Sequence, residues 1–211
     1  MKKDYSKATS LQKKTSLRFN NLLEIIAQEK PKMRIRFSTS NPQDMSDEVI
    51  DVIAKYPNIC RHIHLPVQSG SNKILKKMNR LHTREEYLVL IKKIKTKIPN
   101  CSISHDIIAG FPSEDDKDHL DTLNLMESVK YEYGYMFKYS ERPGTMAQKK
   151  FTDNVPLEIK NLRLKEIITK QNKHSDPDAS NTGGVSKALQ YLFGTFDVQY
   201  MKYFALLVAK S

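Results

Sequence analysis

Four short segments of the sequence are rich in Ser, Gly, Pro and Asn, the residue types that let a backbone come close to a ligand. They are residues 38–43, 66–71, 110–114 and 140–145. The side chains there that could form hydrogen bonds to a ligand are Gln68, Ser69, Ser71, Ser140 and Thr145. Gly and Pro also occur in ordinary turns, so one such segment alone is equally well explained as a loop. Four of them along one edge of a sheet favour a binding site.

Two histidines and two cysteines are the candidates for metal chemistry. His62 and His64 lie in one expected strand with a single residue between them, so their side chains share a face of the sheet. No third ligand follows at a suitable spacing, and a packed or solvent-facing pair is therefore favoured over a metal site. Cys60 and Cys101 each stand next to the start of an expected strand, and we expect buried structural thiols. The sequence therefore predicts no metal site.

The charged residues near these segments leave two interpretations open. Glu114 begins an acidic stretch that suits the start of a helix, but it is also close enough to the loops to contact a ligand. Arg142 directly follows an expected strand and could pair with a carboxylate or phosphate, or lie on the surface. The lysine-rich stretches 73–77, 92–97 and 149–150 could contact a nucleic-acid backbone or simply be solvated.

The elements that must position these residues alternate between strand and helix. Strand patterns cover residues 33–37, 61–67, 102–109 and 133–139. Helical patterns cover residues 10–30, 72–78, 83–97, 114–129 and 156–173, with a further helix starting at Ser46 and a capping box formed by Thr83 and Glu86. This order predicts an α/β protein with a parallel sheet, open or barrel-like, of about four βα units. The carboxyl ends of its strands meet at one edge, where all four loops fall.

The composition is that of a folded, basic protein. The 211 residues are 39% hydrophobic and carry a net charge of +11. No apolar run has bilayer-spanning length, no export signal is indicated and two cysteines exclude a disulfide framework, so we expect a cytoplasmic protein without membrane contact. Residues 175–211 are electrically balanced, so the excess positive charge lies in residues 1–174. We place a domain boundary between residues 174 and 175, with residues 175–211 as a linker and tail of uncertain structure.

The loop sequences resemble one known family, the radical S-adenosylmethionine tRNA methylthiotransferases of the MiaB type. The segments that carry the resemblance are residues 34–42, 64–71 with 78–83, 106–114 and 139–147. They occur in the order typical of the family and extend the resemblance over roughly residues 1–174. One position departs from the pattern, since Ser113 stands where the family usually has Gly.

The resemblance implies a fold, a reaction and a set of cofactors. Members of the family add a methylthio group to an isopentenylated adenosine beside the tRNA anticodon, using S-adenosylmethionine and two 4Fe-4S clusters on a partial six-stranded βα barrel. One cluster is held by a motif of three closely spaced cysteines, which is absent from this sequence. By resemblance, the chain corresponds to the C-terminal portion of the radical domain, without the first two strands and the N-terminal domain. The match ends after His174.

The resemblance also suggests roles for residues in the loops. Gln68 and Ser71, with Ser69 between them, are candidates for binding the ribose or carboxylate of the cofactor. Gly110 and Phe111 are candidates for its adenine, since a flat ring suits backbone and aromatic contacts. In a separate role, Arg142 and Thr145 would lie nearer the RNA or the methionine end of the cofactor.

Three functional hypotheses remain open from the sequence. In the first, the chain is a truncated relative of the tRNA methylthiotransferases that is inactive alone, because thiolates must hold a radical-generating cluster. In the second, it is a basic RNA-binding remnant without catalysis. In the third, it is one half of a split enzyme and complements a separately encoded N-terminal half. A gene fragment with an unpaired sheet edge is the non-functional alternative.

Overall fold

The computed structural model of the 211-residue chain describes residues 17–38 and 41–175. In chain order its elements are α2 (Phe19–Glu29), η2 (Pro42–Asp44), α3 (Asp47–Lys55), β1 (His62–His64), α4 (Asn72–Lys77), α5 (Arg84–Lys97), β2 (Ser102–Ala109), α6 (Asp116–Val129), β3 (Tyr133–Lys138), α7 (Met146–Lys150) and α8 (Leu157–Ser175). The proposed tail, residues 175–211, lies outside the described residues apart from Ser175. None of the helices in the described ranges has an apolar stretch of the length that a bilayer crossing needs.

The three strands form a parallel sheet in the order β1-β2-β3, which confirms the predicted α/β class. The prediction of a strand at residues 33–37 was wrong. This segment forms only one parallel bridge, between Ile35 and Ile59. Within the described ranges this segment has a neighbouring strand segment on one side only, where a short ladder is common. The four expected strands are therefore three strands and a bridge.

The second expected strand, residues 61–67, is also shorter than predicted. Strand β1 ends at His64, although the backbone N–H groups of Leu65 and Gln68 still donate to β2 carbonyls. Pro66 stands between them and has no N–H group, so it cannot continue the ladder. Pairing resumes as a single bridge between Gln68 and Ile107.

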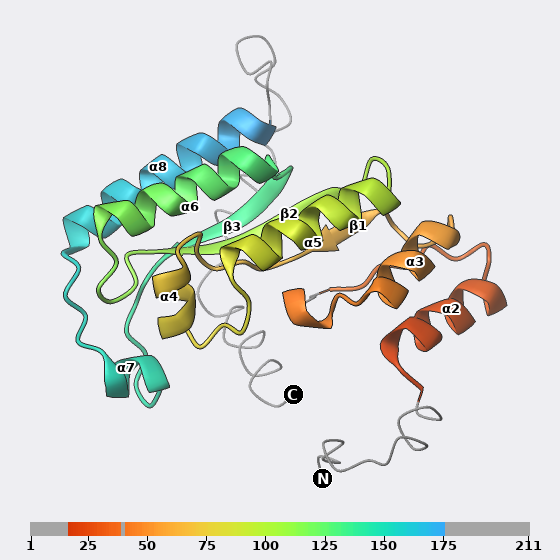
Figure 1. The fold of residues 1–211 in the computed structure, drawn as a ribbon, viewed down its shortest axis with the longest axis horizontal. Coiled ribbons are helices and arrows are strands. Elements are labelled where there is room, and N and C mark those ends of the chain that lie inside the picture. The colour runs from red at the N-terminus through yellow and green to blue at the C-terminus, as the bar shows by residue number, and fades with distance from the viewer. Residues whose placement is uncertain (1–16, 39–40, 176–211) are drawn as a thin grey trace.

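The two faces of the sheet differ in what covers them. Helices α5, α6 and α8 pack along one face (Figure 1), where Ile63, Ile103 and Ile107 join the buried core. We call the opposite face the open face. The sheet residues on it are His62, His64, Ser102, Ser104, Asp106, Ile108, Tyr133, Tyr135 and Phe137. The three aromatic residues of β3 stay partly exposed there.

The helix starts follow the capping signals in the sequence. The predicted capping box is present, since Thr83 accepts from the Glu86 N–H and Glu86 accepts from the Thr83 N–H. An equivalent box joins Asp115 and Asp118 at the start of α6. Ser46 stands at the N-cap position of α3, as expected. The short helix α7 was not predicted.

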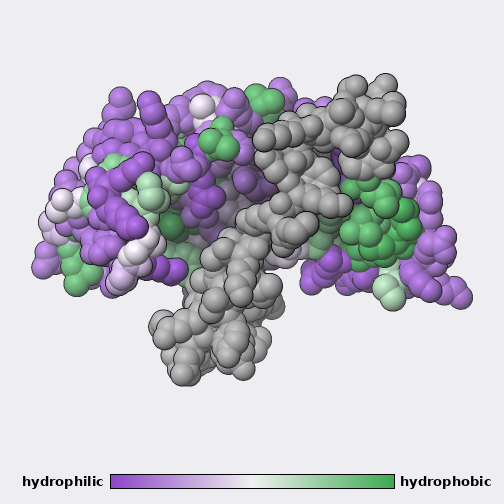
Figure 2. Space-filling view, turned by 90° about the horizontal axis from the view of Figure 1, so that it is seen from below, coloured by the Kyte–Doolittle hydropathy of each residue, from purple (hydrophilic) through white to green (hydrophobic). Residues whose placement is uncertain are grey.

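Helix α2 leaves apolar side chains in contact with solvent. Phe19, Leu22 and Ile25 are 44%, 51% and 45% exposed, whereas Leu23 and Ala27 of the same helix are buried. Figure 2 shows apolar side chains gathered on the side of the molecule where α2 lies. We call Phe19, Leu22 and Ile25 the α2 apolar patch. It lies at the end of the molecule where the sheet begins with the Ile35 bridge.

Candidate functional site

The loop after β1 is held tightly against helix α6. The Gly70 N–H donates to Thr122 Oγ1 at 2.9 Å. A Cβ atom on Gly70 would lie 2.5 Å from the Asp121 carbonyl oxygen and 2.6 Å from Thr122 Cα, so only glycine allows this approach. Gln68 adopts a positive φ of 72° and forms the bridge to β2. The loop is thereby fixed at the carboxyl edge of the sheet.

Ser69 and Ser71 point into this loop–helix contact. Ser71 Oγ donates to Asp118 Oδ1 at 2.6 Å and caps helix α4 by accepting from the Ile74 N–H. Ser69 Oγ accepts from the Ser71 N–H and lies 3.4 Å from Thr122 Oγ1. Both serines are buried, and their hydroxyl groups have partners within the protein. Their assignment to cofactor binding stays a prediction.

Gln68 differs from the two serines. Gln68 as a whole residue is 7% exposed, and its carboxamide, unlike the two serine hydroxyls, is not bonded to Asp118 or Thr122 of α6. A carboxamide offers both donors and acceptors, so it can serve a polar ligand at the strand ends. Among the predicted cofactor-binding residues, Gln68 is the side chain best placed for that role.

The loop after β2 is built around Gly110 and Phe111. Gly110 has a φ of 72°, and its N–H donates to Glu114 Oε1 at 2.8 Å. A Cβ atom on Gly110 would collide with the Lys160 side chain of α8, so α8 fixes this position as glycine. Phe111 is buried and packs edge-on against Tyr139 at a centroid distance of 5.1 Å. The residues predicted to hold adenine therefore lie in a rigid, aromatic corner of the molecule.

Glu114 has an internal partner instead of facing the open edge. Arg163 of α8 donates through Nη1 to Glu114 Oε1 at 3.0 Å and through Nη2 to Asp116 Oδ1 at 2.7 Å. Burial raises the pKa of the Glu114 carboxyl above its usual range, although Arg163 and the Gly110 N–H both favour the ionised form. Glu114 thus joins the loop to α8, and its contact with a ligand stays a prediction.

The position that departs from the family pattern has an unusual backbone. Ser113 adopts a φ of 67°, the left-handed region that favours glycine. Its N–H donates to Asn154 Oδ1 at 2.7 Å, which holds the turn in place. The usual glycine of the family is explained by this conformation.

The loop after β3 is exposed. Thr145 caps helix α7 by accepting from the Gln148 N–H, and its hydroxyl donates to the Arg142 carbonyl at 2.9 Å. The Arg142 guanidinium is exposed and has no ion pair within the described ranges. The loop thus presents one cation at the same edge of the sheet, and the proposed contacts of Arg142 and Thr145 with RNA or cofactor stay predictions.

The histidine pair and the cysteines can be placed directly. His62 and His64 share the open face as predicted, and each ring hydrogen-bonds a serine of β2. Within the described residues no group of three or more His, Cys, Asp or Glu side chains could hold a metal ion. Cys101 is buried, and burial raises the pKa of its thiol to about 11. The prediction that Cys60 is a buried thiol was wrong, because this residue is only half-buried. Arg34 Nε donates to its sulfur at 2.9 Å.

Three lysines of the lysine-rich stretches are engaged in ion pairs: Lys73, Lys93 and Lys97. Lys73 lies within 2.6 Å of carboxylate oxygens of both Asp115 and Asp118. Lys93 and Lys97 pair with Asp47 and Asp51 of α3. Half-exposed pairs of this kind contribute little to stability, but they reduce the positive potential offered to a nucleic acid.

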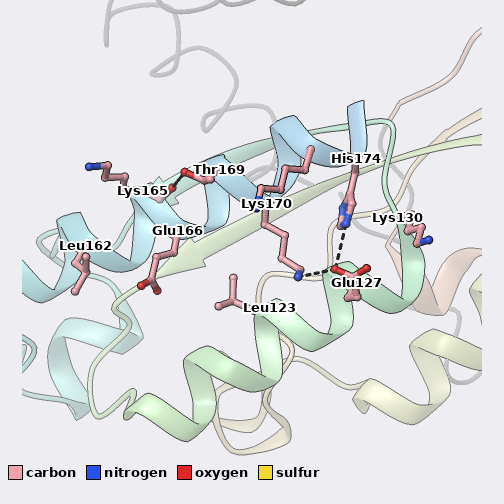
Figure 3. A pocket seen from close by; sticks show the side chains of 10 residues that line it. Leu123, Glu127, Lys130, Leu162, Lys165, Glu166, Thr169, Lys170 and His174 are labelled. Carbon is pink, nitrogen blue, oxygen red and sulfur yellow. Dashed lines mark hydrogen bonds and ion pairs between the residues drawn. The ribbon is translucent and has the colours of Figure 1, made fainter. Parts of the chain in front are cut away.

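A groove of about 730 Å³ runs between α6 and α8 on the helical side of the sheet (Figure 3). Glu127 pairs there with Lys170 at 2.6 Å and with His174 at 3.5 Å. Both walls belong to helices that cover the face opposite the open face. The groove is therefore separate from the site at the strand ends.

Sequence reasoning missed the contribution of α8 to the site. The buried stripe of this helix is Lys160, Arg163, Ile167 and Gln171, whereas its Leu157 and Leu162 are 59% and 53% exposed. Lys160 Nζ reaches Asp153, and its stem covers Gly110. The helical spacing of these four residues was the available signal, but three of them are polar, and polar residues ordinarily mark the solvent-facing side of a helix.

Comparison with known proteins shows which superfamily this chain belongs to. The sequence model of the radical SAM superfamily matches residues 10–126. The chain belongs to the radical SAM superfamily. Coproporphyrinogen III oxidase (HemN) from Escherichia coli, a radical SAM enzyme, shares the fold with a TM-score of 0.54 and 20% identity, over 64% of this chain and 31% of that chain. This likeness supports the barrel-type α/β fold.

Curated relatives confirm the resemblance to the methylthiotransferases. The chain is 60% identical over 186 residues to the tRNA-2-methylthio-N(6)-dimethylallyladenosine synthase of Christiangramia forsetii, covering 88% of this chain and 39% of the relative. The synthase of the same name from Flavobacterium psychrophilum is 61% identical over 83% of this chain and 36% of its own length. The one from Bacteroides fragilis is 52% identical over 82% and 38%. The chain thus spans well under half the length of these radical SAM relatives.

Proposed function

We propose that this chain is the C-terminal portion of a radical SAM domain that methylthiolates an isopentenylated adenosine in tRNA. The observation that carries the proposal is the 60% identity with a synthase named for that product. The arrangement at the strand ends supports it, because the loops after all three strands lie at one edge with a polar side chain, an aromatic corner and an exposed cation. In this role the edge binds part of the cofactor and faces the RNA.

The residues of the edge suit S-adenosylmethionine. We assign Gln68 to a polar group of the cofactor and the Gly110–Phe111 corner to its adenine ring. Ser69 and Ser71 act through the loop that they hold, and Arg142 and Thr145 are placed toward the RNA or the methionine end. When bound, the cofactor supplies the radical chemistry, and the protein supplies position and shielding from water.

The residues do not suit a 4Fe-4S cluster. The sequence contains two cysteines, Cys60 and Cys101. Both stand next to the amino ends of their strands, β1 and β2, at the edge opposite the loops. Three neighbouring thiolates would be needed to hold a cluster with an open iron. We therefore propose that these 211 residues alone do not cleave the cofactor.

Binding of the cofactor can be tested on the chain itself by isothermal titration with S-adenosylmethionine. Replacing Gln68 by Ala removes a hydrogen-bonding side chain and should weaken binding by about tenfold, the equivalent of about 1.4 kcal/mol. Gln28→Ala, an exposed glutamine on α2, should leave the affinity unchanged. Equal affinities for wild type and Gln68→Ala would contradict the assignment of Gln68.

The lack of catalysis in the isolated chain is tested by anaerobic iron–sulfur reconstitution. We expect no stable 4Fe-4S absorption spectrum and no cleavage of S-adenosylmethionine. A stable cluster together with cleavage would contradict the proposal.

A split enzyme is the second candidate, and the α2 apolar patch favours it. Three neighbouring apolar side chains about half exposed are typical of a surface that another polypeptide covers. The partner would be a cysteine-bearing N-terminal portion of the radical domain. Co-expression of this chain with the N-terminal portion of a relative should give a complex, and Leu22→Glu should abolish it. Leu81→Glu, at an isolated exposed leucine, is the matched control.

A further inference from the structure

A row of alternating serine and histidine side chains crosses the open face of the sheet. The parallel register pairs His62 with Ser102 and His64 with Ser104. Ser102 Oγ lies 2.7 Å from His62 Nδ1, and Ser104 Oγ lies 2.8 Å from His64 Nδ1. We call these four residues, together with Asp106, the serine–histidine row.

The pairs are also linked to one another. Ser104 Oγ lies 3.3 Å from His62 Nε2, so this hydroxyl stands between the two imidazole rings. The Tyr133 hydroxyl lies 2.9 Å from the same nitrogen and is its second partner. His64 Nε2 lies 3.3 Å from Asp106 Oδ1. The row is therefore continuous from Ser102, at the amino end of β2, to Asp106, whose neighbour across the sheet is the Gln68 loop. Ser104 is fully buried, which restricts its hydroxyl to these partners.

One arrangement of protons satisfies every link when Asp106 is ionised and both rings are neutral. A carboxylate only accepts, so His64 carries its proton on Nε2 and accepts on Nδ1 from the Ser104 hydroxyl. His62 Nε2–H is shared between Ser104 Oγ and the Tyr133 hydroxyl oxygen, which both accept from it, and His62 Nδ1 accepts from the Ser102 hydroxyl. Every donor then points the same way, toward Asp106.

We propose that the serine–histidine row is a proton relay between solvent at the amino ends of the strands and Asp106 on the open face. A proton from solvent binds Ser102 Oγ, and the Ser102 proton moves to His62 Nδ1. The His62 Nε2 proton moves to Ser104, the Ser104 proton to His64 Nδ1 and the His64 Nε2 proton to Asp106. One proton enters and one arrives, with no change in electron count, and the resulting carboxylic acid can protonate a basic atom of a ligand.

The surroundings of His62 favour its neutral form. Tyr133 stacks on His62 at a centroid distance of 5.2 Å, and burial lowers the pKa of the His62 imidazole. The other charged or titratable groups that act on the row are Arg36 and Glu132 near His62, Tyr135 beside His64, Arg80 and Tyr87 near Asp106, and His105 near both His64 and Asp106. A neutral imidazole with one donor and one acceptor is the form that a relay requires.

The ligand that would use Asp106 rests on the proposed function: it is the RNA base or cofactor held at the adjoining edge. The relay itself can be tested without any ligand. Ring ¹⁵N NMR spectra of the 211-residue chain report the tautomer of each histidine, and Asp106→Asn identifies the signals that respond to ionisation of Asp106.

We expect both rings to carry Nε2–H, and both to shift when Asp106 titrates. In Ser104→Ala the response of His62 should be lost while that of His64 remains, because the hydroxyl between the rings is gone. Ile108→Val, on the same strand and face but outside the row, should leave both responses intact. Backbone amide spectra check that each variant is folded.

A His62 response that survives in Ser104→Ala would overturn the relay, since the coupling would then pass through space alone. A His64 ring protonated on Nδ1 only would overturn it as well. Neither result bears on cofactor binding, which the Gln68→Ala titration tests separately.

Discussion

At the scale of single residues, Ser113 and His105 each sit where the fold restricts the choice of side chain. Ser113 has a left-handed backbone conformation, and its N–H donates to Asn154 Oδ1. His105 is fully buried under α8, where Nε2 bonds Gln171 Oε1 at 2.8 Å and its ring fills the space beside Gly134. Both positions make predictions about stability that do not depend on function.

Replacing Ser113 by Gly should raise the free energy of unfolding by about 1 kcal/mol, because glycine adopts a positive φ without the steric cost of a Cβ atom. Urea denaturation measures the change. Ser128→Gly, in the last turn of α6, should instead lower stability, by about 0.5 kcal/mol. A loss of stability in Ser113→Gly would show that the serine side chain makes a stabilising contact.

His105 should make the fold sensitive to acid. Burial lowers the pKa of its imidazole from 6.5 to about 4, so the unfolded chain binds the proton more readily than the folded one. The contribution to stability is complete above pH 6.5 and is lost as the pH falls toward 4, by up to about 3 kcal/mol. His105→Phe should remove this part of the difference between urea midpoints at pH 7 and pH 4.5. An unchanged difference would contradict it.

At the scale of elements, helix α8 fixes the loop after β2 through buried charge. Arg163 bonds Glu114 and Asp116, and the Lys160 stem covers Gly110. A buried ion pair gives little net stability compared with an apolar pair, but removing one partner leaves a buried charge without compensation. The position of the candidate adenine corner therefore depends on a helix that follows it by some fifty residues along the chain.

Arg163→Met should lower the free energy of unfolding by about 3–5 kcal/mol. Adding Glu114→Gln to that variant should recover part of the loss, since the uncompensated carboxylate is then gone. Lys170 lies on α8, as Arg163 does, and forms a half-exposed ion pair with Glu127 of α6. Lys170→Met breaks this pair and should lower the free energy of unfolding by at most about 1 kcal/mol. Urea denaturation measures the free energy of unfolding of each variant. Equal losses for Arg163→Met and Lys170→Met would argue against a special role of the buried Arg163–Glu114 pair.

At the scale of the whole molecule, the net charge of +11 and the α2 apolar patch describe its surface. Some of the lysines pair with nearby carboxylates, among them Lys73, Lys93 and Lys97. Others, such as Lys92, have no ion pair within the described ranges. If tRNA is the partner, as proposed, the unpaired lysines should carry more of the contact than the paired ones.

Binding of tRNA to the chain should weaken as salt rises, with log K falling linearly with log salt concentration. Lys92→Ala should reduce that slope and weaken binding more than Lys93→Ala does, because Lys93 already pairs with Asp47 at 2.7 Å. Filter binding over a range of salt concentrations measures both effects. Affinity that does not depend on salt would contradict an electrostatic contact with RNA.

The sequence by itself determined the class of the fold, the edge where the loops meet and the family. Alternating strand and helix patterns, the Thr83 capping box and the four loop motifs are local signals, and local chemistry sets them. Whether residues 33–37 form a strand could not be predicted from their own sequence. A strand ladder depends on which other segments of the chain lie beside it. Tertiary structure alone decided that Glu114 faces Arg163, that α8 buries its polar stripe and that His62, Ser104, His64 and Asp106 form one row. Each of these depends on segments distant in the chain being brought into contact by the parallel register and by helix packing, which no local pattern encodes.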